Sequence, residues 1–223
     1  MILSIRKLTK QYKHQDGLID ALKDISFDVQ KGDFVTITGP SGSGKTTLLL
    51  SLAGLINISS GEILFNSFRI DKAKDNLLSD FRKNNVGFVM QNFALVPYLT
   101  AIENLMLPLA THKLKNAEQI SRAFELLELV GLENRKNHLP RELSSGQQQR
   151  VAIARALINQ PSLILADEPT GNLDPSLSTD ILNLLKQINQ DKGITILMVT
   201  HSPLAAKYGN YCITLNNGTI KIE

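Results

Sequence analysis

The sequence predicts an α/β fold with a mainly parallel sheet, antiparallel strands near the N-terminus and an inserted helical region. Three observations support this prediction. A glycine-rich loop follows a β-branched run near residue 39, later apolar runs of buried-strand type end in polar residues, and residues 93–143 show helical periodicity instead. At 223 residues the chain is large enough for one substantial domain, and two independent domains are not expected.

Composition narrows the class of protein. A hydrophobic content of 43% with 20% charged residues is ordinary for a soluble globular chain. No apolar run approaches the ~18–20 residues that span a bilayer, and the N-terminus lacks a signal-peptide layout, so we expect a cytosolic chain. The single cysteine, Cys212, excludes an internal disulfide and is expected to be a small buried residue. A net charge of +3 without a basic block gives no reason to expect a nucleic-acid partner.

Two strand-like segments precede the glycine-rich loop. Residues 2–7 and 18–29 carry strand-like apolar rhythms, and we expect them to form antiparallel strands. Tyr12 lies between these two segments. An aromatic ring there can stack on a purine base, although an isolated tyrosine more often packs in an ordinary way, and the residues alone leave both interpretations open.

The glycine-rich loop at residues 39–46 has the P-loop pattern, a glycine and four further residues followed by Gly-Lys-Thr. Its neighbours are a strand-like run and a helix start, so backbone N–H groups and the helix N-terminus would face one anion. The interpretation as a plain tight turn does not explain Lys45, which would reach the β- and γ-phosphates, or Thr46, whose hydroxyl would contact Mg²⁺. We predict a P-loop NTPase core whose ATP contacts are Gly39, Pro40, Ser41, Gly42, Ser43, Gly44, Lys45, Thr46 and Thr47.

The next segment leads to a candidate polar contact. We expect a short hairpin near residues 62–66, a helix over 77–83 and a buried strand over 86–90 that ends at Gln91. Ligands of open α/β sheets bind where the strands leave the sheet. Gln91 is therefore a candidate for contact with the metal and with water, the alternative being a solvated loop glutamine.

The region that follows is predicted to be helical. Its clearest helix covers residues 117–130. One apolar face is expected to contain Ile120, Ala123, Phe124, Leu127 and Val130. We expect one domain over 1–223, with a nucleotide-binding core of about 1–91 and 144–223 and a helical subdomain of about 92–143.

Two capping-box spacings precede helices. Thr100 and Glu103 form one, and Ser144 and Gln147 form the other, ahead of an apolar helix at 151–158. The plain interpretation of the second is a well-capped helix. The alternative is a second anion site, made by a helix N-terminus beside a hydroxyl and a glycine. Two anion sites facing one nucleotide would have to come from different regions of the chain or from different chains.

Two further strands end in groups suited to hydrolysis. The run over residues 162–168 has the form of a Walker B strand, in which Asp167 holds magnesium through its hydration shell and Glu168 orients or deprotonates water. Solvated acids at a strand end are the alternative. The strand over 194–200 is followed by His201, which could reach a γ-phosphate or the attacking water, although a lone histidine there is more often a cap or a surface residue.

The remaining C-terminal segments are predicted to be structural. Residues 171–174 and a following proline should form a turn, and a helix should cover about 178–190. Residues 211–222 have the pattern of a hairpin turning at Asn216, Asn217 and Gly218.

Taken together, these blocks resemble the ATP-binding subunit of ABC transporters over nearly the whole chain. The family's Leu-Ser-Gly-Gly-Gln signature is represented at residues 143–147 by Leu-Ser-Ser-Gly-Gln. Ser145 thus replaces the first glycine and adds a Cβ and a hydroxyl near the expected phosphate. By resemblance, Tyr12 would be the aromatic residue that stacks on adenine, and Gln91 would be the Q-loop glutamine. Glu168 would be the catalytic base, Asp174 the D-loop acid and His201 the switch histidine.

The resemblance also implies ligands and partners. ATP and Mg²⁺ would be bound, and two subunits would pair head to tail as a homodimer. Magnesium would be contacted by Thr46, Gln91 and Asp167. The residues that close over the ATP of the partner subunit would be Ser144, Ser145, Gly146, Gln147 and Asp174.

Within the family, residues 92–109 and 168–174 resemble the branch of MacB-type macrolide exporters, LolD-type lipoprotein-releasing ATPases and the FtsE type. This implies an integral membrane permease on another polypeptide, with the chain at the cytoplasmic face of the cell membrane. One alternative is an ABC ATPase of DNA repair or translation, but the long coiled-coil insertions and double cores of those proteins are absent from this sequence. The other is a regulatory module with little turnover, which the paired Asp167 and Glu168 argue against.

Overall fold

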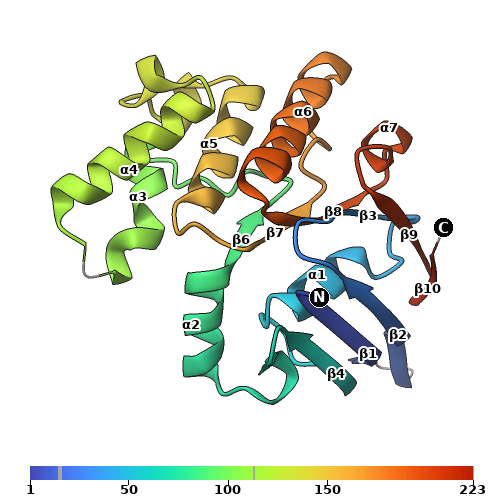
Figure 1. Cartoon of the computed structure of the whole chain (residues 1–223). Helices are drawn as coiled ribbons and strands as arrows, with labels where there is room; N and C mark the ends of the chain where they lie inside the picture. Colours follow the sequence, from blue (N-terminus) through green and yellow to red (C-terminus); the bar gives the residue numbers. More distant parts are fainter. Residues whose placement is uncertain (15–16, 113, 223) are drawn as a thin grey trace.

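The computed structural model describes residues 1–14, 17–112 and 114–222, which form two β-sheets and their covering helices (Figure 1). The strands are β1 (Leu3–His14), β2 (Gly17–Val29), β3 (Phe34–Thr38), β4 (Ser60–Phe65), β5 (Phe68–Arg69), β6 (Val86–Val89), β7 (Leu163–Asp167), β8 (Thr195–Thr200), β9 (Tyr211–Asn216) and β10 (Thr219–Ile222). The α-helices are α1 (Lys45–Leu52), α2 (Asp75–Asn85), α3 (Ala101–Met106), α4 (Asn116–Leu129), α5 (Ser145–Leu157), α6 (Pro175–Lys192) and α7 (Pro203–Ala206). Short 3₁₀ turns cover Ile70–Lys72, Leu107–Thr111, Glu133–Arg135 and Pro140–Glu142.

The main sheet has six strands in the order β10-β9-β3-β8-β7-β6. Strands β9, β3, β8, β7 and β6 are parallel, and β10 is antiparallel to β9. Strands β3, β7 and β8 are buried over nearly their whole length because both faces of this sheet are covered. The predicted α/β class with a mainly parallel sheet is confirmed.

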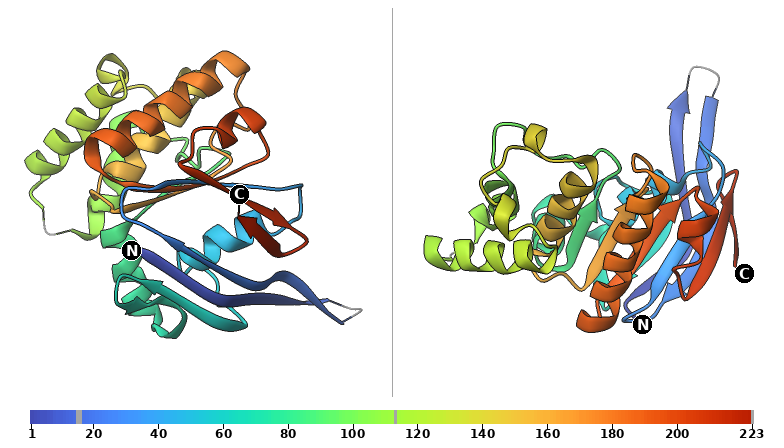
Figure 2. Two further views of the ribbon diagram at one scale, coloured as in Figure 1. Left: turned by 45° about the vertical axis from the view of Figure 1, so that its right-hand side comes forward. Right: turned by 90° about the horizontal axis from the view of Figure 1, so that it is seen from above.

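The second sheet is antiparallel, in the order β2-β1-β4-β5. Its apolar face and one face of the main sheet enclose α1, and their side chains form a single buried cluster. The first strand is longer than predicted, because β1 and β2 pair over most of their length as a ribbon (Figure 2). Tyr12 therefore lies within β1, opposite Ile19 of β2, and the expectation that it lies between two strands is wrong.

The opposite face of the main sheet is covered by α5 and α6, with α3 and α4 beyond them (Figure 1). Of the face predicted for α4, the side chains of Ala123, Leu127 and Val130 are buried. Ile120 belongs to the same predicted face but is 43% exposed. Periodicity alone does not report how far along a helix the neighbouring elements extend.

Local signals in the sequence are also confirmed. The capping box of Thr100 and Glu103 is present at the start of α3, and the β9–β10 hairpin turns at Asn217 (φ 46°) and Gly218 (φ 76°). Across the described ranges, none of the helices combines the length and the apolar character that crossing a bilayer requires.

Candidate functional site

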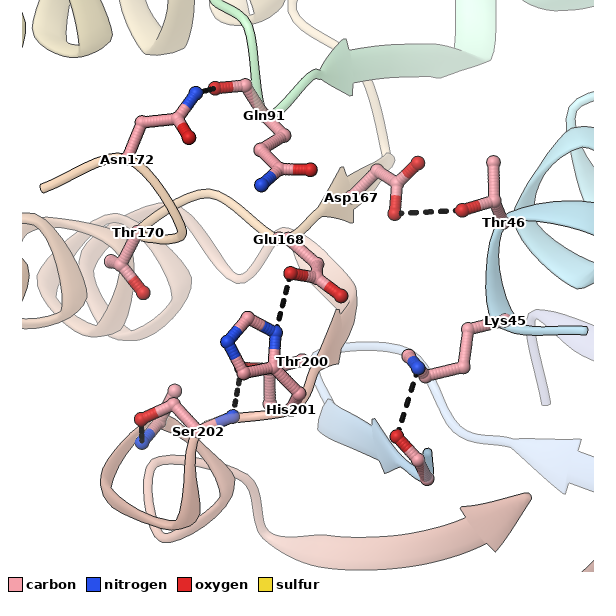
Figure 3. A network of polar contacts seen from close by, with 12 residues as sticks. Lys45, Thr46, Gln91, Asp167, Glu168, Thr170, Asn172, Thr200, His201 and Ser202 are labelled. Atoms are coloured by element: carbon pink, nitrogen blue, oxygen red, sulfur yellow. Dashed lines mark hydrogen bonds and ion pairs between the residues drawn. The ribbon is translucent and has the colours of Figure 1, made fainter. Parts of the chain in front are cut away.

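The parallel strands bring the predicted polar residues to one edge of the main sheet (Figure 3). In the register, Val89 of β6 pairs with Ala166 of β7, and Asp167 pairs with Val199 of β8. The residues that follow each strand therefore leave the sheet side by side. Gln91, Glu168 and His201 lie near one another although they are more than 30 residues apart in sequence.

Two glycines of the P-loop pack directly against the backbone of neighbouring segments. A Cβ on Gly39 would collide with the carbonyl oxygen of Leu215, and one on Gly44 would collide with that of Ala21. Gly44 also has φ 104°, a conformation that other residues rarely adopt. Gly44 is the N-cap of α1, and among the described residues no side chain caps this helix. The first amides of α1 are thus available to an anion.

Lys45 supplies the positive charge beneath this loop. Its side chain is 6% exposed, and Nζ donates to the carbonyl oxygens of Gly39 and Pro40 at 2.9 Å each. Both acceptors are neutral groups of the same loop. The buried hydroxyl of Ser43 has no hydrogen-bond partner within the described ranges. The loop therefore offers an ammonium, an unused hydroxyl and open amides, a donor set that fits the phosphates of a nucleotide.

The donors next to Lys45 fit magnesium. The Thr46 hydroxyl donates to Oδ1 of Asp167 at 3.2 Å, so two oxygen ligands from α1 and β7 already face each other. Burial raises the pKa of Asp167 above its ordinary value, and the Thr46 hydroxyl opposes that rise. No group of three His, Cys, Asp or Glu side chains able to hold a metal was found among the described residues. The Thr46 hydroxyl and the Asp167 carboxylate suit Mg²⁺, which keeps waters and binds through one or two carboxylates together with substrate phosphates.

Glu168 is held in a strained backbone conformation. Its φ is 45°, in the left-handed region that is unfavourable for a residue with a long side chain, and its N–H donates to Val199 O at 3.0 Å. Its Oε2 lies 2.6 Å from Nδ1 of His201, whose side chain is 62% exposed against 18% for that of Glu168. The carboxylate is therefore oriented by the imidazole. Such strain is found where position serves function.

Gln91 and Glu168 converge on one spot beside Gly171. A Cβ added at residue 171 would lie 2.8 Å from Gln91 Nε2 and 3.3 Å from Glu168 Oε2, so the glycine leaves room for both side chains. The backbone of Gln91 is fixed as well, because Asn172 Nδ2 donates to its carbonyl oxygen at 2.9 Å. The amide and the carboxylate can thus contact the same small ligand.

Residues of the P-loop, together with Gln91 and Glu168, line one cavity of about 340 Å³. Its lining is Ala21, Ser41, Gly42, Gly44, Lys45, Thr46, Thr47, Gln91 and Glu168. His201 lines a neighbouring hollow of about 370 Å³ that shares Glu168. Tyr12 lies outside the described lining; it is 42% exposed, and the ammonium of Lys10 sits 4.8 Å from its ring centre.

Comparison with known proteins identifies the family. The model of the family described as ABC transporter matches residues 22–171. The uncharacterized ABC transporter ATP-binding protein MJ0796 of Methanocaldococcus jannaschii is 42% identical over 226 residues, covering 100% of this chain and 96% of that protein. The chain belongs to the ABC transporter ATP-binding family.

Two further matches agree with the first. The lipoprotein-releasing system ATP-binding protein LolD of Francisella tularensis subsp. holarctica is 44% identical over 223 residues, covering 100% of this chain and 96% of that protein. The dimeric structure of a post-hydrolysis state of the MJ0796 cassette, bound to ADP and Pi, superposes with a TM-score of 0.92 at 40% identity, covering 100% and 98% of the two chains. The ABC ATPase fold predicted from the sequence is confirmed.

The signature segment of this ABC protein lies outside the described lining of its own ATP cavity. Ser144 and Gln147 form the predicted capping box at the start of α5, and Ser145 is the first residue of that helix. A Cβ on Gly146 would lie 3.1 Å from Leu177 of α6, so the glycine also permits close helix packing. In a single chain, these four residues stabilise and pack α5.

Asp174 stabilises the start of helix α6. Its Oδ1 accepts from the backbone N–H groups of Ser176 and Leu177, both at 3.0 Å, and so caps α6. The sequence prediction assigned it to the partner's site and did not recognise this cap, although an Asp directly before a proline and a helical run is a known start signal.

Three residues that tie this site together were not recognised from the sequence. Asn172 holds the Gln91 carbonyl, and the fully buried Gln149 of α5 donates to Pro169 O at 2.7 Å. Arg155, also in α5, donates to two carbonyls of the loop after Gln91. Their partners are 20 to 81 residues away in sequence, so no local pattern marks them.

Proposed function

We propose that this chain is an ATP-binding and ATP-hydrolysing subunit that works as a homodimer and powers a separate integral membrane permease. The observation that carries the proposal is the convergence of Lys45, Gln91 and Glu168 on one cavity, with Asp167 facing the Thr46 hydroxyl in its lining. The solved relative described as dimeric and bound to ADP and Pi supports both hydrolysis and dimerisation. The cofactors are ATP and Mg²⁺.

The chain's own groups would divide the chemistry. Backbone amides of residues 39–47 and the Lys45 ammonium hold the phosphates, and Thr46, Asp167 and Gln91 hold the metal. Bound Mg²⁺ supplies charge that stabilises the terminal phosphates during transfer. Glu168 orients the attacking water and accepts its proton, and His201 keeps that carboxylate in place through the 2.6 Å contact.

The second chain would complete the site. Ser144, Ser145, Gly146, Gln147 and Asp174 of one subunit would close over the ATP held by the other, which accounts for their position outside their own cavity. Tyr12 would stack on the adenine at the open side. The core would comprise about 1–91 and 144–223, and residues of about 92–143 would form the helical subdomain.

The relatives support a proposal for the partner and the place of action. The relative LolD is described as part of a lipoprotein-releasing system, and we propose the same branch, which includes MacB-type exporters, for this chain. The chain would sit at the cytoplasmic face of the cell membrane, bound to its permease. Substrate selectivity would belong to that permease.

The test separates binding from turnover. Glu168→Gln preserves size and hydrogen bonding but removes the base, so we expect ATP to bind normally while turnover falls by about 100-fold or more. The variant should also accumulate as an ATP-dependent dimer on size-exclusion chromatography. Unchanged steady-state turnover in Glu168→Gln would refute the role given to this residue, and absence of ATP hydrolysis by the wild type with candidate permeases would refute the function.

A further inference from the structure

The loop after Gln91 is held by a guanidinium from a distant helix. Arg155, in the third turn of α5, donates from Nη1 to Ala94 O at 2.6 Å and from Nη2 to Phe93 O at 2.9 Å. The planar fork of arginine matches two successive carbonyls, which a single ammonium cannot do. This pair of bonds fixes the loop two and three residues beyond Gln91.

The two residues it holds are in an unfavourable conformation. Phe93 has φ 61° and Ala94 has φ 48°, both in the left-handed region. The N–H of Ala94 also donates to Asn92 O at 2.6 Å, which closes a three-residue turn, and the form of that turn with positive φ is rare and strained. Strained backbone of this kind persists where surrounding contacts hold it. The described contacts of Arg155 are of that type.

Arg155 is a costly residue to place there. Burial lowers the pKa of its guanidinium, and no carboxylate pairs with it among the described residues. The residue is partly buried, and the share of its charge withdrawn from water loses hydration that two neutral carbonyls only partly replace. What this side chain specifically adds is the pair of bonds to the Phe93 and Ala94 carbonyls, which needs the guanidinium fork.

We propose that Arg155 is a positioning residue for ATP hydrolysis, holding the strained turn at Phe93 and Ala94 so that the Gln91 amide stays beside Glu168 in the ATP cavity. The same helix begins with the signature segment at Ser144. Arg155 thereby joins the helix that would meet the partner's ATP to the loop that serves its own. This inference rests on the proposed function.

The first experiment measures turnover and binding in Arg155→Met, with Arg150→Met as the matched control. Arg150 lies on the same helix and donates to Val130 O at 3.0 Å, away from the Gln91 loop. We expect kcat to fall by about tenfold or more in Arg155→Met while the ATP Kd stays within about threefold, because small misplacement of a reacting group costs rate more than binding. Arg150→Met should change kcat by less than about twofold. The melting temperature of Arg155→Met should not fall below that of Arg150→Met.

A double-mutant cycle then asks whether Arg155 acts through Gln91. In a Gln91→Ala background, Arg155→Met should lower kcat by less than about twofold, because the group it positions is already gone. An undiminished loss in that background would overturn the proposal, as would a wild-type kcat in Arg155→Met. Arg155→Lys keeps the charge without the fork and should show the same loss and the same cycle. It provides the test if the methionine variant does not fold.

The two levels of inference fail in different ways. If the wild-type protein hydrolyses ATP and Glu168→Gln does not, the proposed function is supported, whatever the result of the double-mutant cycle. Additive losses alongside that activity overturn the role of Arg155 alone. Wild-type protein that does not hydrolyse ATP with its permease overturns both.

Discussion

Helices α1 and α5 both begin after a loop that contains glycine or serine, yet their first turns are satisfied in opposite ways. The N-cap of α1 is Gly44, and no described side chain caps the helix. The N-cap of α5 is Ser144, whose hydroxyl accepts from Gln147 N–H at 3.3 Å while Gln147 Oε1 accepts from Ser144 N–H at 3.0 Å. The first four N–H groups of a helix lack partners within it. The start of α1 is therefore open to a phosphate, whereas α5 already caps itself.

The difference teaches how one chain can bind a nucleotide that two chains hydrolyse. The α1 site has open amides together with the buried ammonium of Lys45, so it gains interactions as soon as phosphate arrives. The α5 end loses little when no ligand is present, because its cap is internal. In the proposed dimer, it would therefore stay folded until a partner subunit presents ATP. Four substitutions test this asymmetry.

The largest effect is expected for Lys45→Ala. Removing the buried ammonium takes away the charge nearest the phosphates, and ATP Kd should rise by about 100-fold, or ~2.7 kcal/mol. Equilibrium binding of a fluorescent ATP analogue measures it. The matched control is Lys186→Ala, which loses a bond of 3.2 Å to Tyr208 O outside the cavity and should keep the wild-type Kd. Equal affinity in Lys45→Ala would contradict the assignment of α1 as the phosphate site.

Gly44→Ala should act on folding as well as on binding. The new Cβ would strike the carbonyl of Ala21, and alanine is disfavoured at φ 104°. We expect a loss of about 2 kcal/mol, or roughly 4–8 °C in melting temperature for a chain of this size. Differential scanning calorimetry gives the value. Gly131→Ala is a control for left-handed strain alone, because nothing described lies within 4 Å of its Cβ position. It should lower the stability by less than Gly44→Ala does.

Ser144→Ala should separate the two helix starts. Loss of the cap removes about 1 kcal/mol of stability, and the ATP Kd of dilute, monomeric protein should be unchanged because Ser144 is outside its own cavity. In a Glu168→Gln background, however, the ATP-dependent dimer should weaken. Sedimentation velocity across a concentration series measures that equilibrium. A higher ATP Kd for the monomeric variant would contradict the different roles given to the starts of α1 and α5. So would ATP-dependent dimerisation as strong as without the Ser144→Ala substitution.

Ser145→Gly, which restores the family's usual glycine, should have the smallest effect. Ser145 is the first residue of α5, a position where glycine costs a few tenths of a kcal/mol relative to serine. ATPase activity per subunit should stay within about threefold of wild type, since the hydroxyl of Ser144 and the start of the helix are retained. A change of a much larger size would mean that Ser145 itself contacts the phosphate.

Features that depend on close neighbours could be predicted from the sequence. The capping boxes join residues three apart, and the turn at Asn217 and Gly218 needs left-handed backbone that those two residues tolerate. Buried parallel strands showed as runs rich in apolar and β-branched residues, and the residue after each run could be placed at the ligand edge. The P-loop and the Asp167 and Glu168 pair could therefore be located from the sequence.

The sequence alone determined the fold class, the positions of the parallel strands and the polar residues at their carboxyl ends, because hydrophobic period and turn residues act over a few positions. Only the tertiary structure decided that Tyr12 lies inside a long strand, that Ile120 is exposed and that Glu168 is in a strained conformation against His201. It also revealed Arg155 and Asn172, whose bonds reach 61 to 81 residues along the chain. Such contacts depend on which elements become neighbours after folding, and no local pattern encodes that.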